Sequence, residues 1–219
     1  MKSAALRKEL EPLAGPLILT ERAAPEVMPT GISEVDSITG GLPRGCLTEI
    51  LGPVSSGRTS VMLSILASAT ASGEVCAVVD AGDALDPASA AAAGIDLARL
   101  LWIRCGGNAE HALKATDLLV QGGGFGLVVM DFGDVAPKTA RRISLTSWFR
   151  LRRAVEHTPT ALVAVEQEAN AKSCASLILE SRREGALWRG ALFRGFRVKV
   201  ERRKPVHANI ASFEAMALG

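Results

Sequence analysis

The sequence predicts an α/β fold: a mainly parallel sheet flanked by helices, with a C-terminal antiparallel extension. Three observations support this prediction. A glycine-rich loop at 52–60 stands between an apolar run typical of a strand and an apolar run typical of a helix. Continuous apolar runs then alternate with helix-like segments, as in sheets that are buried on both faces. Two of these runs, 75–80 and 127–131, end in an aspartate.

Each element is predicted from its apolar pattern and from the turn residues around it. Core strands are expected at 47–51, 75–80, 100–104, 127–131 and 160–166. Helices are expected at 61–67, 86–94, 108–121 and 138–157. Short strands at 176–180, 196–204 and 209–214 are expected to form the antiparallel extension.

The N-terminal region differs in pattern from the core. A short helix is expected at 3–13, followed by a short strand at Leu17-Ile18-Leu19 and a linker. We therefore divide the chain into an arm, residues 1–28, and one core domain, residues 29–219.

Composition limits the class of protein. The 219 residues suit a single large core, and 48% of them are hydrophobic. The net charge of +2 does not by itself indicate a nucleic-acid-binding protein. The cysteines follow no zinc or redox spacing; they are Cys46, Cys76, Cys105 and Cys174. No segment has the length and apolarity of a membrane span, so we expect a cytoplasmic protein with reduced thiols.

The glycine-rich loop carries a phosphate-binding pattern with one departure. The pattern G-x-x-x-x-G-K-[ST] runs from Gly52 to Thr59, but Arg58 takes the place of the lysine. The loop amides and the start of the following helix are expected to bind a polyphosphate, and the Thr59 hydroxyl to bind Mg²⁺. Arginine keeps the charge but is larger and planar, so we expect ATP or ADP with Mg²⁺ to bind weakly or without hydrolysis. The expected nucleotide-binding residues are Gly52, Pro53, Ser55, Ser56, Gly57, Arg58, Thr59 and Ser60.

Several further motifs surround this loop in a fixed order. They are Pro29-Thr30-Gly31, Gly41-Leu42-Pro43-Arg44-Gly45, Glu49-Ile50-Leu51-Gly52-Pro53, Asp80-Ala81-Gly82-Asp83-Ala84-Leu85-Asp86-Pro87, Val128-Val129-Met130-Asp131 and Arg197-Val198-Lys199-Val200. The series closely resembles the ATPase core of the bacterial RecA recombinases across roughly residues 15–215. The resemblance implies a RecA-like core, with no counterpart of that family's separate C-terminal domain.

The resemblance also implies roles for single residues. Asp131 matches the acid that holds the Mg²⁺ water shell, and Gln167 matches the glutamine that senses the γ-phosphate. Arg202 and Lys204 match two basic residues that reach the nucleotide of a neighbouring subunit. Taken alone, these two residues would equally fit a solvated strand face.

The departures from the family pattern bear on activity. Gly82 stands at the position of the catalytic glutamate, and glycine has no group that can orient a water molecule. Both loops that bind DNA in the family are short here; only residues 168–171 separate Gln167 from Lys172. We therefore expect an inefficient ATPase that performs no strand exchange, and we assign no catalytic residue.

Two segments, 92–102 and 147–153, resemble ImuA-like proteins. These RecA-related accessory factors act in SOS mutagenesis and translesion synthesis after DNA damage. The resemblance implies partners such as an inactive Y-family polymerase homologue, an error-prone polymerase or RecA. In the RecA family, a strand at the position of Leu17-Ile18-Leu19 docks on the next subunit. The resemblance to RecA therefore also implies self-association through the arm.

The stretch 182–204 is basic and contains interleaved aromatic residues, a pattern that suits single-stranded DNA. The DNA-binding candidates are Arg182, Arg183, Arg189, Arg194 and Arg197. A strand with cationic side chains on its wet face and aromatic residues in the core would show the same pattern.

Two functions remain open at this point. The first is a RecA-like accessory protein of DNA repair that acts as a scaffold or regulator and has a degenerate nucleotide site. The second is a minimal RecA-like, DNA-dependent ATPase that binds ATP and single-stranded DNA and forms filaments.

Overall fold

The computed structural model describes residues 25–205 and 209–217. An eight-stranded sheet forms the centre, in the order β10-β9-β8-β3-β7-β6-β4-β5. Its strands are β3 (Leu47–Leu51), β4 (Cys76–Asp80), β5 (Leu100–Arg104), β6 (Leu127–Asp131), β7 (Ala161–Glu166), β8 (Leu177–Arg189), β9 (Leu192–Lys204) and β10 (Asn209–Met216). Neighbouring strands from β8 to β5 are parallel, whereas β8–β9 and β9–β10 are antiparallel. The predicted fold class is confirmed.

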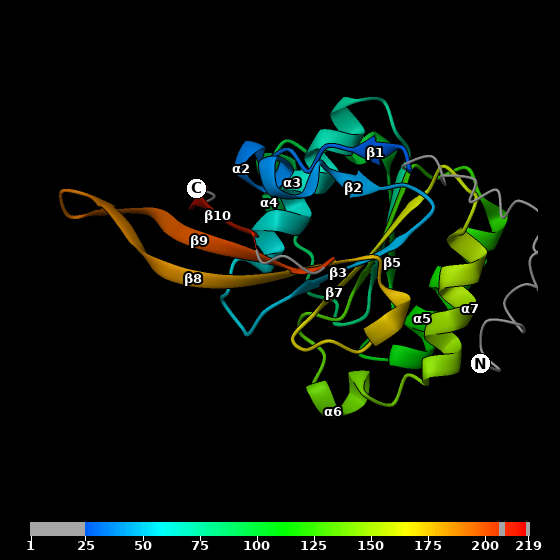
Figure 1. Ribbon diagram of the computed structural model, residues 1–219. Coiled ribbons are helices and arrows are strands. Elements are labelled where there is room, and N and C mark those ends of the chain that lie inside the picture. Colours follow the sequence, from blue (N-terminus) through cyan, green and yellow to red (C-terminus); the bar gives the residue numbers. More distant parts are fainter. Residues whose placement is uncertain (1–24, 206–208, 218–219) are drawn as a thin grey trace, which may run out of the picture.

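Helices cover both faces of this sheet (Figure 1). They are α2 (Ser33–Thr39), α3 (Arg58–Ala71), α4 (Pro87–Ala92), α5 (Ala109–Gly122), α6 (Pro137–Ala140) and α7 (Leu145–Val155), with 3-10 turns η1 (Leu97–Arg99) and η2 (Lys172–Cys174). On one face α3 packs Ile65 into a core with Val129, and on the other α7 packs Trp148 into a core with Val128. Adjacent residues of β6 thus enter opposite cores, which explains why the run is apolar throughout. A separate two-stranded sheet pairs β1 (Val27–Met28) with β2 (Leu42–Pro43).

The carboxyl ends of four buried strands meet at one edge of the sheet. The glycine-rich loop follows β3, Asp80 ends β4, Asp131 ends β6, and Gln167 follows β7. Asp80 and Asp131 are direct partners in the parallel ladder. The fold therefore gathers most of the predicted site residues at this edge.

The predicted single helix at 138–157 is wrong. The structure has two helices there, α6 and α7, separated by a turn at 141–144. Ser144 has extended backbone angles, φ −67° and ψ 149°, and its side chain accepts a hydrogen bond from the Ser147 amide. Serine is a preferred residue at the start of a helix, so it begins a new helix here instead of continuing the first.

The C-terminal strands are longer than the short runs predicted at 176–180 and 196–204. β8 and β9 each span 13 residues and form a hairpin that projects beyond the helices (Figure 1). Residues 187–193 pair only within the hairpin, because β3 and β10 contact its lower part. Most side chains of this outer part are exposed. Its sequence therefore lacks the alternation by which strands are recognised.

The predicted arm, residues 1–28, lies outside the described residues except for 25–28, and so do the expected helix at 3–13 and strand at Leu17-Ile18-Leu19. No helix in the described part of the chain combines the length and apolarity needed to cross a bilayer. All four cysteines are free thiols, and three of them are buried.

Candidate nucleotide-binding site

The glycine-rich loop crosses from the end of β3 to the start of α3, closely packed against neighbouring strands. Gly57 has a φ of +93°, and a Cβ atom there would lie 2.5 Å from Cγ2 of Val198. A Cβ atom on Gly52 would lie 2.6 Å from the carbonyl oxygen of Ser181. Both positions therefore require glycine, one for its backbone angle and both for the close approach. The Ser56 and Ser181 hydroxyls, 3.1 Å apart, tie the loop to β8.

The start of α3 presents backbone donors to solvent. Its N-cap is Gly57, and no side chain among the described residues caps the first turn of this 14-residue helix. Uncapped amides and the helix dipole together favour an anion at this end. Binding of a nucleotide's phosphates by this loop and helix start stays a prediction from the sequence pattern.

A cleft of about 360 Å³ opens beside the start of α3. Thr59, Asp131 and Asp134 contribute polar groups to its lining, and Phe193 and Phe196 contribute aromatic rings. The volume lies within the range of small-ligand pockets. Thr59 and Asp131, the two predicted Mg²⁺ ligands, therefore line the same cleft.

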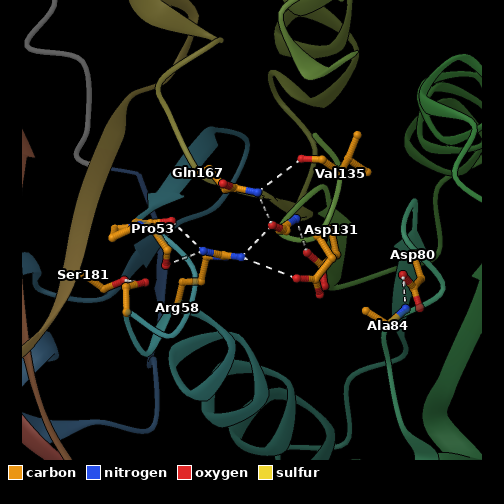
Figure 2. A network of polar contacts seen from close by, with 12 residues as sticks. Pro53, Arg58, Asp80, Ala84, Asp131, Val135, Gln167 and Ser181 are labelled. Atoms are coloured by element: carbon orange, nitrogen blue, oxygen red, sulfur yellow. Dashed lines mark hydrogen bonds and ion pairs between the residues drawn. The ribbon is translucent and has the colours of Figure 1, made fainter. Parts of the chain in front are cut away.

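The Arg58 side chain bridges the glycine-rich loop and the loop that follows β6 (Figure 2). Its Nη1 donates to the carbonyl oxygens of Gly52 at 2.6 Å and Pro53 at 2.5 Å. Its Nη2 donates to the carbonyl oxygen of Gly133 at 2.6 Å and lies 3.8 Å from Oδ1 of Asp134. The side chain is only 5% exposed. Arg58 therefore acts as an internal cross-link within the protein.

The Gln167 side chain is hydrogen-bonded to the loop that follows β6 (Figure 2). Its Nε2 donates to the carbonyl oxygens of Gly133 at 2.9 Å and Val135 at 3.3 Å. The Gly133 carbonyl accepts from both Gln167 and Arg58. One carbonyl thus connects the glycine-rich loop, the loop after β6 and the residue that follows β7.

The two strand-end aspartates have different surroundings. Asp131 is buried, and its Oδ1 accepts a 2.8 Å hydrogen bond from the Gly133 amide. Burial raises the pKa of Asp131 to about 6; the Gly133 amide and Arg58 oppose this shift, while Asp80 and Asp134 add to it. A site of this kind favours a cation that would offset the desolvation.

Asp80 instead holds the backbone of the next loop. Its carboxylate accepts from the amides of Ala84 at 3.1 Å and Leu85 at 2.9 Å, and from the indole Nε1 of Trp102 at 3.2 Å. Asp80 therefore fixes the segment that carries Gly82.

Gly82 faces an acid that the sequence analysis missed. A Cβ atom on Gly82 would lie 3.3 Å from Cβ of Asp134. Asp83 is bound elsewhere, because its carboxylate accepts from Arg104 and from the Gly106 amide, each at 3.1 Å. The only signal for Asp134 was its place three residues after Asp131, in a loop without a motif.

A buried carboxylate pair lies beside the segment 167–171, and sequence reasoning missed it too. Glu49 of β3 and Glu166 of β7 are fully buried. Glu49 accepts from the Asn170 and Ala171 amides at 2.9 Å and 2.7 Å, and Glu166 accepts from the Asn170 side chain. The other oxygen of each carboxylate has no partner among the described residues. Burial raises the pKa of Glu166 to about 8 and also raises that of Glu49.

Arg202 and Lys204 do not line the cleft. Lys204 donates to the carbonyl oxygens of Ser173 and Ala175 within its own fold. Arg202 is half-buried on β9, opposite Leu179 of β8. Their contact with a neighbouring subunit stays a prediction.

The DNA-binding candidates divide between the faces of the hairpin. Arg182 lies opposite Lys199 in the antiparallel β8–β9 ladder, and Arg197 lies two residues before Lys199 on β9. These three side chains therefore share one face of the hairpin. Arg183 lies over the Phe196 ring at 4.9 Å on the other face. Arg189 and Arg194 are exposed near the tip. The hairpin thus presents cations on both faces.

The family model for the RecA N-terminal domain matches residues 17–142, more than half of the chain. The chain belongs to the RecA family. The match covers the glycine-rich loop, Gly82 and Asp131, while Gln167 and the hairpin lie beyond it.

Curated relatives carry the same family name. Protein RecA of Symbiobacterium thermophilum is 47% identical over 108 residues, which cover 48% of this chain and 31% of that protein. Protein RecA of Leifsonia xyli is 35% identical over 163 residues, 67% of this chain and 45% of that protein. Protein RecA of Deinococcus radiodurans is 35% identical over 158 residues, 65% and 43% respectively. The chain therefore spans less than half the length of these relatives.

Proposed function

We propose that this protein is a RecA-family accessory factor of DNA repair, with a nucleotide site that turns over ATP poorly or not at all. The observation that carries the proposal is the internal bonding of Arg58, whose guanidinium donates to three backbone carbonyls. In an active phosphate loop the cation at this position reaches the β- and γ-phosphates. Here that charge stabilises the protein's own loops.

The surroundings of Gly82 support the same proposal. Hydrolysis needs a group that orients and deprotonates the attacking water, and glycine offers none. Asp134 comes close to Gly82 but also lies 3.8 Å from Arg58, which draws its carboxylate toward the glycine-rich loop. Two changes at separate positions thus act against turnover.

The site still fits a bound nucleotide with Mg²⁺. The uncapped start of α3 would hold phosphates, and Thr59 and Asp131 would hold the metal. A bound Mg²⁺ would neutralise phosphate charge and lower the pKa of Asp131. We infer that such a ligand has a structural or switching role.

The proposed partners are DNA-repair proteins and single-stranded DNA. Arg182 and Arg197 share a hairpin face with Lys199 and could follow a phosphate backbone. An ImuA-like role would place the protein in the cytoplasm, beside an inactive Y-family polymerase homologue, an error-prone polymerase or RecA. Self-association through the arm, residues 1–28, belongs to the same proposal.

A second candidate is a minimal DNA-dependent ATPase that forms filaments. It is favoured by the placement of Thr59 and Asp131 in one cleft, with Gln167 bonded to the adjoining loop. The two candidates differ in one measurable property, the release of phosphate from ATP in the presence of DNA.

The deciding experiment measures phosphate release by the purified full chain, with and without single-stranded DNA. A RecA protein serves as the positive control. Our proposal predicts release within a few-fold of the protein-free background in both conditions. Release that DNA stimulates to a rate near that of the RecA control would favour the second candidate.

A further inference from the structure

The Arg58 guanidinium is committed to three carbonyl acceptors. Hydrogen bonds from a charged donor are stronger than neutral ones, and these three are 2.5–2.6 Å long. Turning Arg58 toward a ligand would break all three hydrogen bonds and leave the three carbonyl oxygens without this donor. Arg58 would therefore turn only toward a ligand whose interactions with the guanidinium were more favourable than these hydrogen bonds.

The region that a third phosphate would enter is acidic. Asp131 and Asp134 both line the cleft, and Asp134 is 56% exposed. None of the described residues that line the cleft is a lysine or an arginine. Arg58 is a nearby cation, 3.8 Å from Asp134, but its guanidinium is almost fully buried and is bonded to backbone carbonyls. A γ-phosphate would therefore meet carboxylates in the cleft while this cation stays bonded to the protein's own loops, and like charges at close range repel.

The first two phosphates have different requirements. They contact the loop amides and the start of α3, and those donors do not depend on the position of the Arg58 side chain. Thr59 is exposed at the same helix end. A diphosphate can therefore bind while Arg58 keeps its carbonyl acceptors.

We propose that Arg58 holds the glycine-rich loop in a form that binds nucleoside diphosphates at least as tightly as nucleoside triphosphates. This inference rests on the proposed function, because it assigns a ligand class to the same impaired site. It makes Arg58 and Asp134 specificity-determining residues.

The test is calorimetric titration of Mg-ADP and Mg-ATP into the full-length protein. We expect a Kd for ADP equal to or below the Kd for ATP. Arg58→Lys removes the forked guanidinium and frees a compact cation, and should shift the Kd ratio toward ATP about tenfold, a difference of about 1.4 kcal/mol. Asp134→Asn removes one carboxylate and should shift the ratio the same way by about threefold. Arg99→Lys, at an exposed arginine in the η1 turn that lines neither the cleft nor the hairpin, serves as the control and should leave the ratio unchanged.

Each outcome has a distinct meaning. A Kd for ATP below the Kd for ADP in the wild type, by more than the error of the titration, would overturn the inference and leave the proposed function standing. If neither nucleotide bound, the inference would also be overturned, but the proposed function would stand because a scaffold needs no ligand. Should Arg58→Lys fail to fold, Asp134→Asn provides the same comparison, and an unchanged ratio in that variant refutes the inference. Phosphate release well above the background, with or without DNA, would overturn the proposed function itself.

Discussion

Replacing Glu166 by glutamine should make the stability of the protein less dependent on pH. Glu166 is fully buried, and burial raises its pKa from the ordinary 4.5 to about 8. The neighbouring carboxylate of Glu49 raises it further, while the Asn170 side chain opposes the shift. Lys204 is the cation that acts on Glu49. Glutamine keeps an oxygen that can accept from Asn170 but carries no titrating proton.

The direction of the pH dependence of stability follows from the number of protons that the folded and the unfolded chain bind. Below pH 4.5 the carboxyl group is protonated in both the folded and the unfolded chain, so it adds no penalty. Between pH 4.5 and about 8 only the unfolded chain releases the proton, which favours unfolding. The penalty grows by about 1.4 kcal/mol per pH unit and reaches roughly 5 kcal/mol in total. Above the folded-state pKa both states are ionised, and the penalty stays constant.

The assay is denaturant unfolding of the wild type and Glu166→Gln at pH 5, 6, 7 and 8. The free energy of unfolding of the variant should rise relative to the wild type by about 1.4 kcal/mol per pH unit between pH 5 and 7, and by less between pH 7 and 8, where Glu166 begins to ionise in the folded chain. Glu168→Gln is the matched control for the change from glutamate to glutamine, because Glu168 is exposed and paired with Arg141. If the Glu166→Gln difference from the wild type stayed constant with pH, the buried proton would not exist and the reasoning would fail.

Three further predictions concern packing and binding. Trp148→Ala should cost about 3–5 kcal/mol of unfolding free energy, because the side chain is fully buried; Trp148→Phe should cost far less, since the indole N–H has no partner among the described residues. Gly57→Ala should destabilise more than Gly40→Ala in thermal melts: both have positive φ, but only at Gly57 would the added carbon meet another side chain. If DNA binds the hairpin, Arg182→Ala should lower the salt dependence of single-stranded DNA affinity by about 0.7 in the logarithmic slope. Arg183→Ala, on the opposite face, should change it less; equal slopes for both variants would argue against a one-sided contact.

Much of the fold could be predicted because its strands are buried on both faces. β5 and β6 have the predicted bounds, and β4 and β7 differ from prediction by one residue at the start. The predicted element bounds were wrong where core packing does not impose a pattern of apolar residues on the sequence. The break between α6 and α7 depends on one capping serine, and the outer part of β8 and β9 has no core to impose alternation. Local signals of this kind are weaker than a long apolar period.

The positions of the motif residues in the fold could be predicted from the sequence. The glycine-rich loop, Thr59 and Asp131 occupy the expected edge of the sheet. Asp134 could not be predicted, because its closeness to Gly82 arises only when the ends of β4 and β6 meet. The Glu49–Glu166 pair was likewise hidden, since its closeness depends on the register of β3 and β7. The direction of the Arg58 side chain is a tertiary property that the motif does not encode.

The most direct measurement is a crystal structure of the protein with Mg-ADP. Our account predicts that Arg58 keeps its hydrogen bonds to the Gly52, Pro53 and Gly133 carbonyls while the loop amides hold the phosphates. A guanidinium bonded to the β-phosphate, with those carbonyls released, would contradict the claim that Arg58 serves the protein's own loops.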